Sequence, residues 1–206
     1  MRPTHGLFVP GPAGRIEAHL AEGDAGRASI VLCHPHPQYG GSMHDAVLAT
    51  IAQIAEQRSI VPLRFNFRGV GDSAGSYDRG VGEVDDLLAV LDWLHREHHP
   101  DTLLLGGYSF GSHVVWQALD RAGELARVLL VAPPVGAMSY PVRNGLDTPV
   151  DVIYGDADDF VVAADLERWA AAMPAIRLTA IAGADHFFGG AQRALAEAIE
   201  VALRNV

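Results

Sequence analysis

The sequence alternates short, continuously apolar runs with longer segments in which apolar residues recur every three or four positions. Continuous runs of Val, Ile and Leu are typical of strands covered on both faces, whereas the longer period is typical of helices that bury one face. The alternation therefore predicts an α/β fold with a mostly parallel, doubly wound sheet flanked by helices. Parallel strands are expected over residues 29–33, 60–65, 102–105, 127–132, 150–154 and 176–181.

Helical patterns and a hairpin complete the expected organisation. Residues 7–20 carry turn-forming Pro and Gly between two short apolar pieces, which favours a hairpin leading into the sheet. No repeat, low-complexity tract or linker divides the 206 residues, so the sequence predicts one domain over residues 1–206. Helices are expected over residues 46–56, 84–94, 114–119, 166–173 and 195–203.

Composition excludes several classes of partner. The formal net charge is −10 and the basic residues are scattered singly, so a nucleic acid would be repelled. The longest nearly apolar stretch, residues 128–138, is far shorter than the roughly 20 residues of a membrane span, so no membrane partner is expected. A single cysteine, Cys33, rules out an internal disulfide and is typical of a reducing compartment, which predicts a cytoplasmic protein.

The motif Gly-x-Ser-x-Gly occurs twice, in different contexts. The copy around Ser73 lies in a glycine-rich stretch that no helical pattern follows directly, so we expect a loop without chemistry there. The copy around Ser109 joins an expected strand directly to an expected helix, as a nucleophile elbow does. The helix start would also offer the Phe110 N–H to a developing oxyanion. Ser109 is thus the expected nucleophile, and a glycine-rich turn without chemistry is the alternative.

A serine hydroxyl needs a base, and that base needs a carboxylate to orient it. His186 follows the last expected strand and precedes the last expected helix, at the sheet edge where open α/β sheets keep their active sites. Asp156, Asp158 and Asp159 follow the preceding strand, and the pattern alone leaves open which of them faces the histidine. The chain order Ser, Asp, His is that of the α/β-hydrolases.

These motifs, in this order, resemble the α/β-hydrolase superfamily over nearly the whole chain. The resemblance implies an α/β-hydrolase fold with Ser109, Asp158 and His186 as catalytic residues. Asp158 is selected because residues 155–161 match a Gly-x-x-Asp-x-x-Val pattern in which the superfamily commonly carries its acid. The other two aspartates are then expected to be solvated turn residues.

The segment after the first parallel strand, residues 34–44, reads HPHPQYGGSMH. It resembles the His-Pro-His-Pro version of the oxyanion loop in small members of the superfamily without a lid. Proline has no N–H, so the backbone N–H of His36 is the expected second oxyanion donor beside that of Phe110, with Gln38 and Tyr39 as alternatives.

A metal site is the alternative interpretation of this histidine-rich segment. His34, His36 and His44 are residues of the type that binds zinc. No carboxylate or thiol stands at a matching ligand spacing, so we expect neither a metal nor a cofactor. His34 is instead expected to brace the loop, and His44 to lie at a helix start.

The substrate pocket is less constrained by the sequence. A guanidinium can grip a carboxylate with two parallel hydrogen bonds, so Arg64 or Arg68 is an alternative anchor for an acidic substrate group. Their segment otherwise resembles a structural loop of the superfamily. Candidate pocket residues are His34, Tyr39, Tyr108, Phe160 and Phe187, with Phe188 as a further aromatic.

Residues 133–149 are too few to hold the helical lid that many α/β-hydrolases insert there, so an open site is expected. An open site favours small or protruding acyl groups and resembles small carboxylesterases and dienelactone-hydrolase-like proteins. Ser109 stands where the dienelactone branch has a cysteine, which argues against that activity.

The sequence thus predicts a serine hydrolase that cleaves a small-molecule carboxylic ester or thioester through an acyl-enzyme. The alternatives are a peptidase or amidase on the same residues, a metal hydrolase, and a non-catalytic binding protein of the same fold. A homodimer formed through the sheet edge is a further hypothesis.

Overall fold

The computed structural model describes residues 4–22 and 28–204, and the other positions of the expected 1–206 domain lie outside the described residues. The strands are β1 (Thr4–Gly11), β2 (Gly14–Ala21), β3 (Ala28–Cys33), β4 (Val61–Phe65), β5 (Thr102–Tyr108), β6 (Arg127–Val131), β7 (Val150–Gly155) and β8 (Ile176–Ile181). The helices are η1 (Pro37–Tyr39, a 3₁₀ turn), α1 (Ala46–Gln57), α2 (Val81–His98), α3 (Phe110–Ala118), α4 (Ala163–Ala171) and α5 (Gln192–Ala202).

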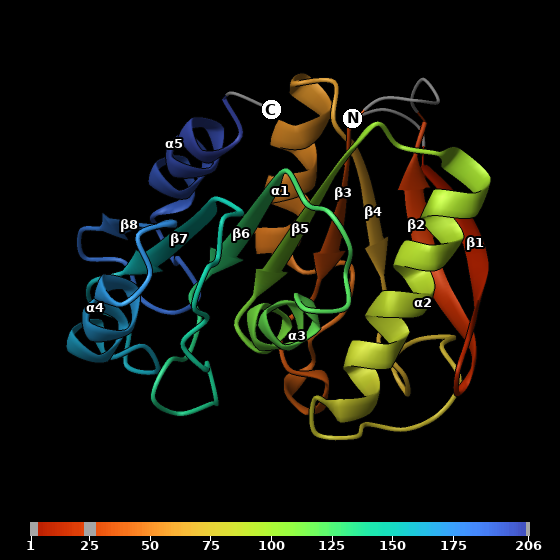
Figure 1. Ribbon diagram of the computed structural model, residues 1–206, viewed down its shortest axis with the longest axis horizontal. Helices are drawn as coiled ribbons and strands as arrows, with labels where there is room; N and C mark the ends of the chain where they lie inside the picture. The colour runs from red at the N-terminus through yellow and green to blue at the C-terminus, as the bar shows by residue number, and fades with distance from the viewer. Residues whose placement is uncertain (1–3, 23–27, 205–206) are drawn as a thin grey trace.

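The strands form one eight-stranded sheet in the order β1-β2-β4-β3-β5-β6-β7-β8 (Figure 1). The six strands β3 to β8 are parallel, which confirms the mostly parallel sheet expected from the apolar runs. β1 and β2 form the expected antiparallel hairpin, with Gly11 opposite Gly14 at its turn, and β2 also pairs antiparallel with β4.

Helices cover both faces of this sheet. α1 and α5 contact each other on one face, and α2, α3 and α4 lie on the other (Figure 1). Trp116 of α3 packs edge to face on Trp169 of α4, with ring centroids 4.8 Å apart. Burial from both sides explains why the central strands are apolar at nearly every position.

β5 is longer than its apolar run predicts, because it continues through Gly106 and Gly107 to Tyr108. Gly107 pairs with Cys33 of β3, and Tyr108 pairs with Val131 of β6. A Cβ at Gly106 would lie 2.6 Å from the Leu32 side chain, so the glycine marks close packing inside a strand rather than a loop. The extension carries the strand directly to the turn at residue 109.

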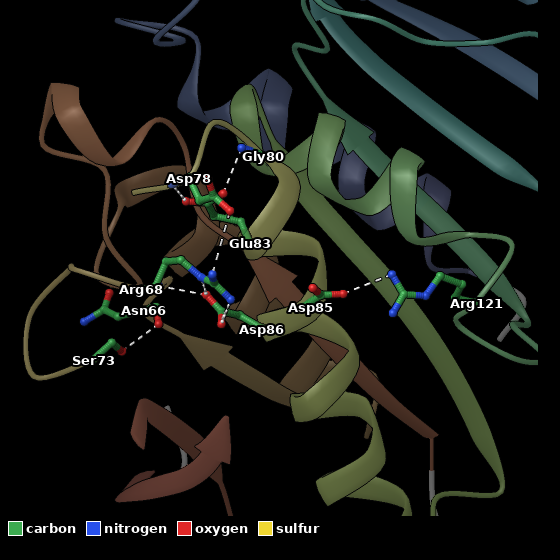
Figure 2. Close-up of polar contacts among 9 residues, drawn as sticks. All are labelled: Asn66, Arg68, Ser73, Asp78, Gly80, Glu83, Asp85, Asp86 and Arg121. Atoms are coloured by element: carbon green, nitrogen blue, oxygen red, sulfur yellow. Dashed lines mark hydrogen bonds and ion pairs between the residues drawn. The ribbon is translucent and has the colours of Figure 1, made fainter. Parts of the chain in front are cut away.

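α2 also begins earlier than its apolar spacing predicts. The Glu83 side chain, in its first turn, accepts hydrogen bonds of 2.8 Å from the backbone N–H groups of Asp78 and Gly80 (Figure 2). Unpaired N–H groups at a helix start are stabilised by such a carboxylate. This contact fixes the end of the loop between β4 and α2.

The connection between β6 and β7, residues 132–149, contains no helix, so the expected absence of a lid is confirmed. It packs on α3 instead. Trp116 Nε1 donates to the Pro141 carbonyl at 3.1 Å, and Arg143 donates to the Trp116 carbonyl at 2.6 Å. Among the described residues, no helix combines the length and apolarity needed to span a bilayer.

Candidate active site

Ser109 lies at the sharp turn between β5 and α3, with φ 52° and ψ −118°. A positive φ is costly for a residue with a side chain and persists only where the surroundings impose it. Here the Ser109 N–H donates to the Val131 carbonyl at 2.9 Å, and its carbonyl accepts from the Ser112 hydroxyl. Tyr140 Oη lies 2.7 Å from Ser112 Oγ and extends this support. The side chain of Ser109 is thereby held at the carboxyl end of the sheet.

The two glycines of the motif permit this turn. A Cβ at Gly111 would lie 2.1 Å from the Cys33 carbonyl oxygen, and one at Gly107 would lie 2.4 Å from the Gly111 carbonyl oxygen. Both obstacles are backbone atoms, which cannot rotate away as a side chain can. Only glycine fits at either position without moving β3 or α3.

A continuous hydrogen-bonded chain joins Ser109 to a histidine and an aspartate. His186 Nε2 lies 2.9 Å from Ser109 Oγ, and His186 Nδ1 lies 2.7 Å from Asp158 Oδ2. An ionised carboxylate can only accept, so Nδ1 carries the proton and Nε2 is free to accept from the serine hydroxyl. Asp158 Oδ1 accepts from the N–H groups of Phe160 at 2.7 Å and Val161 at 3.0 Å. Both oxygens of this buried carboxylate are thus paired.

The other two candidate aspartates have different surroundings. Asp156 Oδ1 accepts from the Gly183 N–H at 2.6 Å and so ties together the loops after β7 and β8. Asp159 is exposed. Of the three, Asp158 is the one whose carboxylate reaches His186.

His186 is held by its neighbours as well as by Asp158. Tyr108 Oη donates to the His186 carbonyl at 3.0 Å, and burial raises the pKa of this hydroxyl well above its ordinary value, so the donor stays protonated. The Phe160 ring lies 4.8 Å from the imidazole and the Phe187 ring 5.4 Å from it. The imidazole therefore has little freedom to turn away from Ser109.

Some backbone N–H groups of the loop after β3 donate to acceptors within the loop, and another does not. The N–H of Gln38 donates to His36 Nδ1 at 3.2 Å, and the N–H of Tyr39 donates to the His36 carbonyl at 3.0 Å. Within the described residues, the backbone N–H groups of His36 and Phe110 donate to no protein acceptor. Both residues line the cavity beside Ser109, and they are the two oxyanion donors that the sequence leads us to expect.

The cavity beside Ser109 and His186 has a volume of about 510 Å³. Tyr39, Tyr108, Phe160 and Phe187 line it, as the sequence leads us to expect. The remaining lining residues are Pro35, His36, Gly40, Gly41, Asp45, Phe110, Pro134 and Met138.

Two expected pocket residues do not line this cavity. His34 is fully buried behind the loop, where Nδ1 donates to the Pro35 carbonyl at 2.7 Å and Nε2 accepts from the Phe67 N–H at 3.1 Å. Burial lowers the pKa of His34 to about 4, so the imidazole is neutral and braces the loop. Phe188 is likewise buried in the core.

Sequence reasoning missed Asp45, Pro134 and Met138. The last two come from the connection after β6, and Asp45 is the cap of α1. Each lies in a connection that follows a parallel strand, and none is part of a catalytic motif. The signal that could have identified them is their position at the carboxyl edge of the sheet, where all these connections meet.

The two arginines weighed as anchors for an acidic group do not line the cavity. Arg68 forms two hydrogen bonds to Asp86, from Nε at 2.9 Å and from Nη2 at 2.8 Å (Figure 2). Arg64 donates to the Met43 carbonyl at 3.3 Å. The Arg68 guanidinium supports the β4–α2 loop and that of Arg64 supports the connection between β3 and α1, and neither lines the cavity.

The serine of the other Gly-x-Ser-x-Gly motif, Ser73, makes hydrogen bonds that hold the fold together. Ser73 Oγ donates to the Asn66 carbonyl at 2.7 Å, as Figure 2 shows, and accepts from the Glu17 N–H at 2.9 Å. Its side chain links the β4–α2 loop to β2. No histidine contacts it within the described part of the chain.

The histidines weighed as zinc ligands point to different partners. His34 faces Phe67, His36 Nε2 lies 3.1 Å from Tyr77 Oη, and the His44 ring lies 5.2 Å from that of His19. Across residues 4–22 and 28–204, no three His, Cys, Asp or Glu side chains are grouped so as to hold a metal ion.

Comparisons with known proteins give the following likenesses. No protein-family model matches the chain. A protein of Rickettsia prowazekii, described as uncharacterized, is 36% identical over 193 residues, which are 88% of this chain and 81% of that protein. The structure of a member of the α/β serine hydrolases without a lid, from Xanthomonas campestris, superposes with a TM-score of 0.87 at 32% identity and covers 98% of this chain and 94% of that one. An α/β serine hydrolase homologue from Coxiella burnetii superposes with a TM-score of 0.90 at 32% identity and covers 98% of both chains.

Proposed function

We propose that this chain, which belongs to the α/β serine hydrolases, cleaves a small carboxylic ester or thioester through an acyl-enzyme on Ser109. The observation that carries the proposal is the hydrogen-bonded chain of Asp158, His186 and Ser109, with distances of 2.7 and 2.9 Å, beside an accessible cavity. In this arrangement a serine can be activated at neutral pH without a metal or cofactor.

In the acylation step, Ser109 Oγ attacks the substrate carbonyl carbon while His186 Nε2 takes the hydroxyl proton. The Asp158 carboxylate stabilises the imidazolium that forms. The carbonyl oxygen becomes an oxyanion and accepts from the backbone N–H groups of Phe110 and His36, which have no acceptor among the described residues. When the tetrahedral intermediate collapses, His186 returns the proton to the departing alkoxide or thiolate, and an acyl ester on Ser109 remains.

In the deacylation step, a water molecule takes the place of the leaving alcohol or thiol. His186 Nε2 removes a proton from the water as its oxygen attacks the acyl carbon, and the same two N–H groups stabilise the second oxyanion. Collapse breaks the bond to Ser109 Oγ, which regains the proton from His186. The product is a carboxylic acid, and the resting hydrogen-bonded chain is restored.

The size and lining of the cavity favour a substrate with a compact acyl or alcohol group. Aromatic rings from three different loops surround a space of about 510 Å³, which suits a small apolar or aromatic group. The wall contributed by Pro134 and Met138 comes from the short β6–β7 connection, so no lid encloses a long chain.

Labelling by a fluorophosphonate probe, with intact-mass measurement and peptide mapping, tests the nucleophile. The wild type should gain one adduct on Ser109. Ser109→Ala should lose the adduct, and kcat for p-nitrophenyl butyrate and for an acetyl thioester should fall at least about a thousandfold.

Ser73→Ala is the matched control, because Ser73 lies in the same Gly-x-Ser-x-Gly pattern and its partners in the described part of the chain are the Asn66 carbonyl and the Glu17 N–H. It should keep both labelling and turnover, while circular dichroism verifies that each variant is folded. Turnover by Ser109→Ala close to the wild-type rate would overturn the proposal. Faster cleavage of a p-nitroanilide than of the matching ester would reassign the activity to amides.

A further inference from the structure

Asp45 is a carboxylate in the wall of the cavity that contains Ser109 and His186. It caps α1, and its Oδ1 accepts from the N–H of Val47 at 2.8 Å and from that of Leu48 at 3.5 Å. Its second oxygen, Oδ2, receives no hydrogen bond from the described residues. The cap therefore fixes the side chain in place and leaves one carboxylate oxygen without a hydrogen-bond donor among the described residues.

No lining residue offsets this negative charge. The lining contains no arginine or lysine, and its histidines are His36 and His186. Burial lowers the pKa of His36, so that imidazole is neutral at neutral pH. Two backbone N–H groups donate to Asp45 Oδ1 and favour its ionised form, against the burial that raises the pKa of this carboxyl.

Asp45 differs in this respect from the other carboxylate of the site. Asp158 is buried behind His186. Its Oδ2 accepts from the imidazole, and its Oδ1 accepts from two backbone N–H groups. Asp45 lines the cavity directly and keeps an oxygen available. A substrate therefore meets the charge of Asp45 rather than that of Asp158.

Aromatic side chains complete the environment. Tyr39, Phe160 and Phe187 are exposed large hydrophobic side chains, and all three line this cavity. Phe160 and Phe187 stand nearly perpendicular, with ring centroids 6.3 Å apart. Aromatic faces attract cations through their quadrupole, and aromatic groups are the usual receptors for quaternary ammonium groups.

We propose that this cavity selects esters by charge, favouring substrates that carry a cationic ammonium group and disfavouring substrates that carry a carboxylate. The inference rests on the proposed function, because it names the substrate class of the same site. An unpaired carboxylate attracts a cation and repels an anion strongly where walls exclude water. The net charge of −10 adds to the same discrimination at longer range.

Asp45→Asn tests the role of the charge with little change in shape. Asparagine caps a helix about as well as aspartate and keeps the oxygen that accepts from Val47 and Leu48. Asp159→Asn is the matched control, since it removes the same charge from an exposed residue near the site that does not line the cavity. Thermal melting verifies that both variants fold.

The first readout is binding, measured by calorimetry with phenyltrimethylammonium and with benzoate. Phenyltrimethylammonium should bind the wild type more tightly than benzoate does. Asp45→Asn should lower the affinity for phenyltrimethylammonium about tenfold and raise the affinity for benzoate. Asp159→Asn should change either affinity by less than twofold. Equal affinity of the ammonium compound for the wild type and Asp45→Asn would overturn the inference.

The second readout is turnover of three acetyl thioesters: acetylthiocholine, its uncharged carbon isostere S-(3,3-dimethylbutyl) thioacetate, and 3-(acetylthio)propanoate. In the wild type, kcat/KM should decrease in that order. The ratio between the first two should fall about tenfold in Asp45→Asn, and an unchanged ratio would contradict the inference.

The two proposals fail in different ways. If the wild type cleaves none of the three thioesters and Ser109 takes up no fluorophosphonate, the hydrolase function fails while the binding data still decide the charge selection. If all three are cleaved at similar rates, the hydrolase function stands and the charge selection fails.

Discussion

The hydroxyl of Tyr108 donates a 3.0 Å hydrogen bond to the backbone carbonyl of His186, although the two residues are 78 positions apart. Tyr108 is the last residue of β5 and directly precedes Ser109, so this bond ties the turn that carries the serine to the loop that carries the histidine. The separation between Ser109 Oγ and His186 Nε2 therefore depends on Tyr108 as well as on Asp158.

Replacing Tyr108 by Phe removes this bond and keeps the ring in the cavity wall. We expect kcat for p-nitrophenyl butyrate to fall about three- to tenfold, as the loss of one hydrogen bond implies, with KM changed less than twofold. Steady-state kinetics of the purified variant measure both constants. Tyr154→Phe, the same change on the buried strand β7, should leave kcat unchanged. Equal kcat for Tyr108→Phe and wild type would show that the bond does not position the histidine.

Asp158→Asn tests which carboxylate orients the imidazole. An amide can donate to His186 Nδ1 and so favours the tautomer whose Nε2 carries the proton, which cannot accept from Ser109. We expect kcat to fall about ten-thousandfold. Asp156→Asn is the comparison, because that side chain accepts from Gly183 and can still do so as an amide. A similar loss in both variants would mean that the acid is wrongly assigned.

The stability of the protein should depend on pH through His34. Its pKa is lowered from 6.5 to about 4 by burial, so between these values the unfolded chain binds a proton that the folded chain does not. Stability from this group is therefore complete above pH 6.5 and is lost as the pH falls to 4, by about 3 kcal/mol in all.

Urea unfolding at several pH values between 7 and 4 measures this loss. His34→Leu should be less stable at pH 7, because the N–H of Phe67 loses its acceptor, but its stability should fall less steeply with pH. The other histidines are present in both proteins, so the difference between the two slopes reports His34. Parallel curves would contradict the assignment.

Gly111→Ala should show how closely the elbow is packed. The added Cβ would lie 2.1 Å from the Cys33 carbonyl oxygen, and we expect the free energy of unfolding to fall by about 3 kcal/mol. Gly6→Ala on the edge strand is the control, because the nearest atom to its added Cβ is 3.6 Å away. That variant should differ from the wild type by less than about 0.5 kcal/mol in urea unfolding. Equal stabilities would show that β3 and α3 can separate at little cost.

Much of the sheet could be predicted from the sequence, because parallel strands buried on both faces are written as unbroken apolar runs. The run 29–33 misses only the first residue of β3, which is buried at five of its six positions. The run 176–181 has the bounds of β8, but this edge strand is mostly not buried and Arg177 and Thr179 interrupt its apolar residues. The end of β5 could not be predicted in this way. Gly106 and Gly107 resemble a turn in the sequence, and only the positions of Leu32 and Gly111 show that they are packing positions within a strand.

The residues of the site likewise fall into those that the local sequence predicts and those that it does not. Ser109 and His186 follow from local context, since each stands where a strand ends and a helix follows. The neighbours of His34 in the sequence predict that it lines the pocket, yet its ring turns inward to Phe67. Asp45 shows the converse, because a cap residue becomes a wall of the cavity only when the loops after β3 and β5 come together. Local sequence patterns predict well where strands end. They predict poorly the direction of a side chain within a loop.

The short connection between β6 and β7 has a kinetic consequence. It is fastened to α3 through Trp116 and Arg143, so this connection does not have to swing shut before bond formation or swing open before product leaves. Enzymes with such gates are often limited by their motion, which slows in viscous solution. For this protein, kcat on p-nitrophenyl butyrate should be unchanged by added sucrose at constant temperature. Its turnover would then be timed by covalent chemistry on Ser109, with bulk water reaching the acylated serine as soon as the alcohol has diffused away.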